Sequence, residues 1–296
     1  MKKIFYSLFA CLFLFIAGCD KIEEDNYLIY SGSSVQWYNG SGVADKSQRT
    51  LLEKYTGVRC VNCPTADVAI SAAQQAYNGQ LIAVAIHDSS LAFCRPIGNS
   101  PDLRTEDGNT WSVFFGISSE GTYPMALVGR NSVASSWDIF TPTSNIESHT
   151  DAALAQNPSI ALAVNAAIQG DTAIMIDVDI EYLTSRTDSL TLTLFIMEDG
   201  IVATQRQPDG TDDENYIHNH VLRDVITDPW GIYINDGRSD SDISANNPVA
   251  AGTKRLGKCL YTAVHHDWIL SNCHIVAFVS EKSSKRILNV AECEIE

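Results

Sequence analysis

The chain has 296 residues, of which 45% are hydrophobic, and its formal net charge is −16 at pH 7. This length is sufficient for two hydrophobic cores. Nucleic acids and anionic lipid headgroups bind to basic protein surfaces. Because this chain is strongly acidic, we expect neither of them as an electrostatic partner.

Residues 1–18 have the composition of a secretory signal peptide. Lys2 and Lys3 precede an apolar stretch over residues 4–17, which is the order of regions typical of such a signal. The stretch is shorter than the roughly 20 apolar residues that a transmembrane helix requires. Residues 16–19 resemble the end of a bacterial lipoprotein signal, in which Cys19 would become the first mature residue and carry fatty-acyl chains such as palmitate. Loss of the two lysines changes the formal charge from −16 to −18.

Residues 19–47 are expected to form a tether. The acidic cluster over residues 20–25 is similar to signals that place lipoproteins on the surface of some Gram-negative bacteria, although an acidic linker would have the same composition. Serine and glycine are frequent in the following residues, which is typical of a flexible linker. We therefore expect a protein anchored to the outer membrane through Cys19, on either the cell surface or the periplasmic face.

The two cysteines Cys60 and Cys63 stand three positions apart, between elements of alternating type. Residues 50–55 are predicted to form a buried strand, residues 66–77 a helix and residues 81–87 another strand. This order around a C-x-x-C motif predicts an α/β thioredoxin-like domain, which we assign to residues 48–157.

The spacing of the two cysteines suits thiol–disulfide exchange. A helix beginning near Cys60 would place its sulfur over unpaired backbone N–H groups, which favour a thiolate. Cys60 would then act as the nucleophile toward a protein or peptide thiol partner, and Cys63 would resolve the mixed disulfide. A structural disulfide is the main alternative. A zinc site would require a second close Cys or His pair, and this half of the chain contains none.

The same domain is predicted to contain a helix over residues 108–115, a strand over 125–129 and a helix over 144–155. Pro124 precedes that strand, at the position where thioredoxin-like domains carry a cis-proline facing the cysteine pair. A trans-proline entering a strand is the alternative, because few X–Pro bonds are cis.

Residues 89–109 form an insertion between these elements. Loops of this length are often binding loops or lids. The insertion contains Cys94, either a third redox thiol or the partner of a distant cysteine.

Residues 158–296 alternate apolar and polar side chains and are predicted to form an all-β immunoglobulin-like sandwich. The predicted strands begin with residues 160–167, 173–182, 189–197 and 201–205. A hairpin turning at Ser283 would bring Cys273 opposite Cys293, and a structural disulfide between these two residues is predicted.

Histidine pairs offer the remaining candidate ligands. His218 and His220 would share one face of a strand, but without a fixed third ligand a polar strand face is the favoured interpretation. The tandem His265 and His266 would point to opposite faces if they lie on a strand. We find no phosphate-binding glycine loop and no nucleophile elbow, and therefore predict no cofactor and no metal.

Three features together resemble the twenty-eight-kilodalton outer-membrane-protein family of bacterial lipoproteins. They are the lipoprotein start, residues 51–57 leading into the C-x-x-C motif and Pro64, and residues 216–223. The resemblance implies attachment to the outer membrane and a surface protein, in some members an adhesin or receptor, without an established reaction. A non-catalytic binding protein with a structural disulfide and an extracellular protein partner is therefore the alternative to thiol exchange.

The motif departs from the usual thioredoxin pattern. Arg59 replaces the tryptophan that usually precedes the first cysteine, and Val61 and Asn62 replace the usual glycine and proline between the cysteines. The direction of electron flow is therefore not implied by the resemblance.

Overall fold

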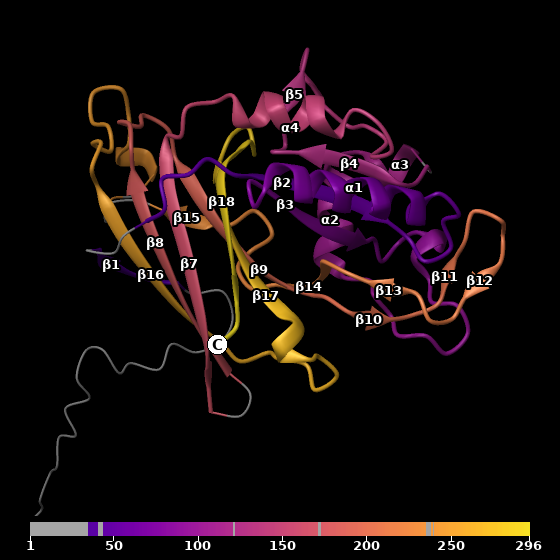
Figure 1. The fold of residues 1–296 in the computed structure, drawn as a ribbon. Coiled ribbons are helices and arrows are strands. Elements are labelled where there is room, and N and C mark those ends of the chain that lie inside the picture. The colour runs from indigo at the N-terminus through magenta and orange to yellow at the C-terminus, as the bar shows by residue number, and fades with distance from the viewer. Residues whose placement is uncertain (1–34, 41–43, 121, 171–172, 235–237, 239) are drawn as a thin grey trace, which may run out of the picture.

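The computed structural model describes residues 35–40, 44–120, 122–170, 173–234, 238 and 240–296. Cys19 and the predicted signal peptide lie outside the described residues. The chain is mostly β-sheet with few helices, and two sheets contain most of its strands (Figure 1).

The larger sheet combines strands from early and late parts of the chain. Its order is β18, β17, β9, β14, β3, β2 and β4, and β15 also pairs with β9. Strand β3 pairs in parallel with β2 and with β14, whereas the other pairs are antiparallel. The strands are β2 (Thr50–Thr56), β3 (Leu81–His87), β4 (Met125–Val128), β9 (Leu190–Glu198), β14 (Val221–Val225), β15 (Ile232–Ile234), β17 (Cys273–Glu281) and β18 (Ile287–Glu294).

The pattern of a buried strand, an amphipathic helix and a second buried strand explains the crossover from β2 to β3. All seven residues of each strand are buried, as expected for parallel strands covered on both faces. Helix α1 (Cys63–Tyr77) connects them and buries Cys63, Ala66, Ile70 and Ala73 along one stripe. The helix begins with a proline in its first turn and ends at Asn78 in a left-handed conformation, both of which are favourable at those positions.

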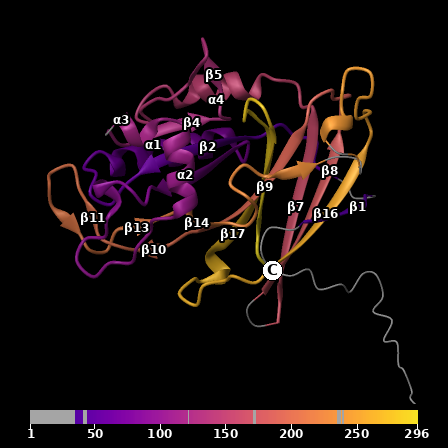
Figure 2. The ribbon, with the colours of Figure 1, turned by 180° about the vertical axis from the view of Figure 1, so that it is seen from behind.

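Further helices cover the two faces of β2, β3 and β4 (Figures 1 and 2). Helix α4 (Ile146–Leu154) packs with α1 in one hydrophobic cluster. Helix α2 (Glu106–Phe114) contributes Trp111 to a different cluster, which also contains Leu51 of β2. Leu52, the next residue of β2, belongs to the cluster of α1 and α4, so the two clusters lie on opposite faces of the strand. Shorter helical segments are α3 (Ile117–Glu120), η2 (Ala92–Cys94), η3 (Asp240–Asp242) and η4 (Leu270–Asn272).

The smaller sheet has the order β1, β16, β8 and β7. Strand β8 buries every second residue, so that one face packs against the larger sheet and the other meets solvent. Its strands are β1 (Gln36–Asn39), β7 (Ile160–Gln169), β8 (Ala173–Tyr182) and β16 (Lys254–Tyr261). Strand β8 has the same bounds as the strand that the sequence predicted over residues 173–182.

Strands β9 and β17 separate two hydrophobic cores. Leu194 and Ile275 point toward the smaller sheet, whereas Phe195 and Phe278 point toward the cluster that contains Trp111. Because both faces are buried, these strands carry continuous apolar runs. The larger sheet thus extends without interruption from the segment of the cysteine pair into the C-terminal strands.

Three short hairpins lie outside the two sheets. Two of them form an arm over residues 201–218, next to α1 at the right of Figure 1. Their strands are β10 (Ile201–Val202) with β13 (Ile217–His218), β11 (Gln205–Arg206) with β12 (Asp212–Asp213), and β5 (Ser132–Val133) with β6 (Ser136–Trp137).

The hairpin of β17 and β18 corrects one prediction. The turn of this hairpin spans residues 281–286, whereas the prediction centred it on Ser283. A β-bulge next to the turn shifts the pairing of the two strands further. Cys293 consequently pairs with Ile275, and both Cys273 and Cys293 are free. Since the register of an antiparallel pair determines which side chains meet, the predicted disulfide between the two cysteines is wrong.

Candidate functional site around the Cys60–Cys63 disulfide

Cys60 and Cys63 form a disulfide in the turn between β2 and α1, with their Cα atoms 5.5 Å apart. The turn is fixed by Cys60 N–H donating to the Gly57 carbonyl at 3.0 Å and by Cys63 N–H donating to the Cys60 carbonyl at 3.3 Å. Cys63 is the first residue of α1, so the sulfurs lie at the end of the helix where backbone N–H groups lack intrahelical partners. The helix begins at Cys63, three residues after Cys60 and three residues before the start of the predicted helix over residues 66–77.

The two cysteines are not equally covered. Cys63 is 0% exposed and Cys60 is 4% exposed, whereas Val61 between them is 37% exposed. Both cysteines are thus buried, and Val61 between them is exposed. The roles of Cys60 as nucleophile and Cys63 as resolving thiol stay predictions.

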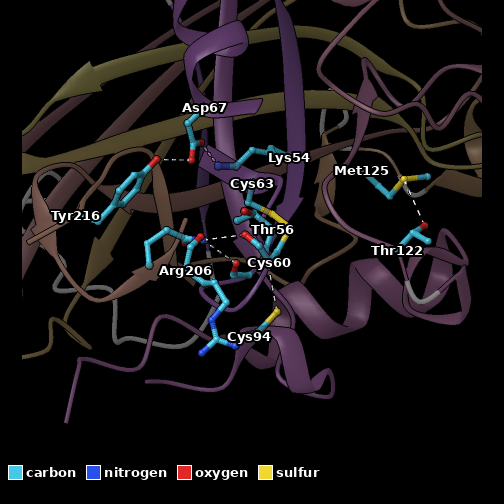
Figure 3. The surroundings of a disulfide bond; sticks show 12 residues. Lys54, Thr56, Cys60, Cys63, Asp67, Cys94, Thr122, Met125, Arg206 and Tyr216 are labelled. Atoms are coloured by element: carbon cyan, nitrogen blue, oxygen red, sulfur yellow. Dashed lines mark hydrogen bonds and ion pairs between the residues drawn. A yellow bond between two sulfur atoms is a disulfide. The ribbon is translucent and has the colours of Figure 1, made fainter. Parts of the chain in front are cut away.

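The peptide bond between Tyr123 and Pro124 is cis, which decides between the two alternatives that the sequence left open. Thr122 and Met125, which flank this pair, belong to the surroundings of the disulfide (Figure 3). Tyr123 shares a hydrophobic cluster with both cysteines, and its ring lies 6.2 Å from that of Phe93. Pro124 is buried at the start of β4.

The insertion after β3 covers the cysteine turn. Arg59 N–H donates to the Phe93 carbonyl at 2.9 Å, and the Arg59 guanidinium donates to the carbonyls of Arg95 at 2.8 Å and Pro96 at 2.6 Å. The side chain of Arg59 is therefore held by the insertion.

Cys94 is buried in the same insertion and is free. Its Sγ donates to the carbonyl of Thr56 at 3.1 Å, which places the thiol beside the cysteine turn (Figure 3). Burial, together with the nearby Asp88 carboxylate, raises the pKa of Cys94 to about 12. Cys94 is therefore a protonated thiol at neutral pH. In this oxidised structure it is neither bridged to a distant cysteine nor a thiolate.

The arm over residues 201–218 adds a contact that the sequence did not predict. Gln205 donates from Nε2 to the Cys60 carbonyl at 3.0 Å, and Arg206 N–H donates to the Val58 carbonyl at 2.8 Å. These residues are more than a hundred positions from the cysteines, and no local pattern marks them. The arm thus holds the cysteine turn through hydrogen bonds to its backbone carbonyls.

A partly buried polar cluster lies next to the turn. The Lys54 ammonium forms an ion pair with the Asp67 carboxylate, which also accepts a hydrogen bond from the Tyr216 hydroxyl at 2.9 Å. Burial and the Asp67 charge raise the pKa of Tyr216 above its usual value. A cavity of ≈ 460 Å³ opens beside these groups, and its other lining residues include Val68, Ile70, Ala83, Ile217 and Asn219.

Two imidazoles continue this polar cluster. The rings of His87 and His218 lie 6.0 Å apart, and His218 Nε2 contacts the Ala203 carbonyl at 3.2 Å. Neither ring nitrogen of His87 has a hydrogen-bond partner among the described residues. Burial lowers the pKa of His87 well below its usual value and that of His218 to about 4, with Lys54 adding repulsion in both cases.

The predicted strand with two histidines on one face is wrong. The strand is broken between β13 and β14, where His220 has a φ of 59°. His220 instead faces Asp199, with Nδ1 and Oδ1 3.1 Å apart. The break separates His218 and His220, which do not form a joint metal site in the structure.

The C-terminal part of this architecture identifies the family. The model of the outer membrane protein Omp28 family matches residues 115–296. The chain belongs to the Omp28 family. This membership places the protein at the outer membrane, as the sequence predicted. The match begins after the cysteine turn, so it includes Pro124, the arm and the later strands but not Cys60 or Cys63. Among the described residues, no helix is both long and apolar enough to cross a membrane.

Three solved structures resemble the chain to different extents. HBP35 of Porphyromonas gingivalis is 14% identical, with a TM-score of 0.60 over 86% of this chain and 77% of that chain. An Agrobacterium tumefaciens protein is 14% identical, with a TM-score of 0.49 over 84% and 95%. A domain of the outer membrane lipoprotein Omp28 from Porphyromonas gingivalis is 17% identical, with a TM-score of 0.31 over 48% and 91%. At these identities the first similarity concerns the fold alone. No curated protein matches the chain significantly.

Proposed function

We propose that this Omp28-family protein is a thiol–disulfide exchange protein attached to the outer membrane through a lipid on Cys19. The observation that carries the proposal is the Cys60–Cys63 disulfide at the start of α1, with the cis peptide bond before Pro124 in its neighbourhood. In this proposal β2, α1, β3 and β4 form a thioredoxin-like unit, and the strands of both sheets that follow residue 158 form an immunoglobulin-like sandwich.

The exchange transfers two electrons. In the reduced state, the Cys60 thiolate attacks one sulfur of a partner disulfide, forming a mixed disulfide and releasing the other partner sulfur as a thiolate. The Cys63 thiolate then attacks Cys60 Sγ, restores the Cys60–Cys63 bond and releases the second partner thiolate. The pair is oxidised and the partner reduced, and the reverse sequence oxidises a partner dithiol. The partner class is protein or peptide thiols.

A non-catalytic surface binding protein, such as an adhesin or receptor, is the second candidate. The burial of both sulfurs beneath the insertion favours it, because reagents and partners reach buried disulfides slowly. Here the bond between Cys60 and Cys63 would be a permanent staple of the turn. The arm and the sandwich would then provide the binding surface for an extracellular protein.

Trapping of a mixed disulfide distinguishes the two candidates. We expect a Cys63→Ser variant in the native envelope to accumulate mixed disulfides through Cys60, because the resolving thiol is absent. The matched Cys60→Ser variant should trap none, since Cys63 is 0% exposed. Failure of both variants to trap a partner would support the second candidate, in which the Cys60–Cys63 bond is a permanent structural disulfide.

The reduction potential of the pair provides a second measurement. The purified mature protein would be equilibrated in glutathione or dithiothreitol buffers, and alkylated thiols counted by mass spectrometry. A potential between about −120 and −270 mV would agree with exchange, whereas one below about −300 mV would identify a structural bridge.

A further inference from the structure

The loop between β16 and η4 brings three potential ligands together, away from the cysteine turn. His265 Nδ1 lies 3.5 Å from Asp267 Oδ2, and His266 Nε2 lies 3.1 Å from Asp267 Oδ1. The three ligand atoms lie within 4.8 Å of one another. On a strand, these two histidines would point to opposite faces. They lie instead in a turn, in which Trp268 N–H donates to the His265 carbonyl at 3.1 Å.

The spacing of these atoms matches a metal coordination sphere. Tetrahedral zinc has bonds of about 2.0–2.2 Å to nitrogen and oxygen, which corresponds to roughly 3.3–3.6 Å between neighbouring ligand atoms. The distance from His265 Nδ1 to Asp267 Oδ2, 3.5 Å, lies within this range, and that from His266 Nε2 to the other carboxylate oxygen, Oδ1, is slightly shorter at 3.1 Å. Asp267 N–H donates to His265 Nδ1 at 3.3 Å, which requires a lone pair on that nitrogen. A metal ion would use the same lone pair.

Contacts outside the ligands hold the loop in shape. Ile269 N–H donates to Glu198 Oε1 at 2.9 Å, and the Tyr261 hydroxyl donates to the Ala263 carbonyl at 3.2 Å. The Trp268 ring stacks on Tyr261, with ring centroids 6.5 Å apart and an interplanar angle of 9°. Since both ends of the loop are anchored, little ordering is needed before the ligands converge.

The type of ligand selects the ion. Imidazole nitrogen suits zinc, copper and nickel, whereas calcium and magnesium prefer sites made of oxygen ligands. The side chains of His265, His266 and Asp267 are 52%, 83% and 67% exposed, so an ion can enter and keep water in its remaining positions. The net charge of −16 also favours cations near the surface.

We propose that His265, His266 and Asp267 bind one divalent first-row transition-metal ion through two imidazole nitrogens and one carboxylate oxygen. The site has three protein ligands and an open position, the arrangement in which a further ligand or water completes the coordination. It is independent of the cysteine turn and of the proposed exchange reaction.

Titration of the metal-free mature protein with ZnCl₂ at neutral pH tests the proposal by calorimetry. We expect one zinc ion per chain, and at least about tenfold weaker binding in each of the His265→Ala, His266→Ala and Asp267→Asn variants. The control is His149→Ala. His149 lies in α4, outside the proposed site, and its imidazole contacts Asp138, so this variant should leave zinc binding unchanged. Equal zinc affinity in the native protein and in the double His265→Ala, His266→Ala variant would overturn the site.

Copper provides an optical test of the location. The ring centroids of Trp268 and His265 lie 6.4 Å apart, close enough for a bound Cu²⁺ ion to quench the indole fluorescence. We expect saturable quenching in the native protein and its loss in the double histidine variant. A Trp268→Phe variant should lose most of the quenching while it retains zinc binding. Quenching that is identical in all variants, or zinc displaced by an equal concentration of Ca²⁺, would contradict the proposal.

Discussion

The buried imidazole of His218 couples the stability of the fold to pH. Burial, and secondarily the Lys54 charge, lower its pKa to about 4, whereas an unfolded histidine titrates near 6.5. As pH falls from about 6.5 to 4, the unfolded chain binds a proton that the folded chain excludes, so stability decreases over this window. The difference of about 2.5 pKa units corresponds to about 3 kcal/mol. His87 changes stability in the same direction.

We therefore predict that acidification lowers the free energy of unfolding by about 3 kcal/mol through His218. Urea unfolding at neutral pH and near pH 4 would measure it. A His218→Gln variant cannot titrate and should lose less stability on acidification. The exposed His266→Gln variant is the matched control, and its pH dependence should equal that of the native protein. An unchanged pH dependence in His218→Gln would contradict the assignment.

At the scale of elements, the insertion over the cysteine turn controls access to the disulfide. The two segments lie close together at Gly57, because a Cβ on this residue would lie 2.6 Å from the Phe93 carbonyl oxygen. A Gly57→Ala substitution must therefore displace the insertion. Overpacking of this kind costs about 1–3 kcal/mol, which raises the population of an opened insertion by about 5- to 150-fold.

We predict that Gly57→Ala speeds reduction of the Cys60–Cys63 disulfide by dithiothreitol and exposes Cys94 to alkylation. Timed alkylation followed by mass spectrometry would measure both. Asn99→Ala, an exposed change in the same insertion, is the control and should leave both rates unaltered. If Gly57→Ala reacted at the rate of the control, the insertion would not be the barrier to the disulfide.

Local patterns explain which elements the sequence predicted. The strand over residues 81–87 and the helix preceding it are set by short-range periodicity and end signals, and the structure has both. The register of the last hairpin depends instead on its turn and on one bulge. Cys293 pairs with Ile275, two positions from Cys273, and this difference in register is why the predicted disulfide does not form. Turn geometry at this level of detail leaves little trace in a single sequence.

Contacts between distant segments were not predictable. Nothing in the sequence marks Gln205 as the partner of the Cys60 carbonyl. Nor does it show that Glu53, within a strand, is 0% exposed and paired with Arg130. The cysteine motif and Pro124 were found because their chemistry is local, whereas the residues that cover them come from the assembled fold.

At the scale of the whole molecule, one sheet joins the segment of the cysteine pair to the C-terminal strands. Ala85 N–H donates to the His220 carbonyl at 2.7 Å, and Ile287 N–H donates to the Gly129 carbonyl at 2.9 Å. The cluster around Trp111 contains residues from β2 and β3 and also from β9, β17 and β18. Separation near residue 158 would expose this cluster and remove β14, the strand that pairs with β3 on the side away from β2.

We therefore predict that the mature protein unfolds in a single cooperative transition, with equal calorimetric and van't Hoff enthalpies. A chain ending at residue 157 should lack stable structure, because burial of Phe195 and Phe278 against Trp111 is lost. Scanning calorimetry of the mature protein and circular dichroism of the truncated chain would measure these outcomes. Two separated transitions, or a truncated chain with native helix content, would instead show that the cysteine-containing segment folds alone. In that case it could exchange disulfides without the later strands, whereas a single transition would make the arm and the C-terminal sheet part of the machinery that positions Cys60.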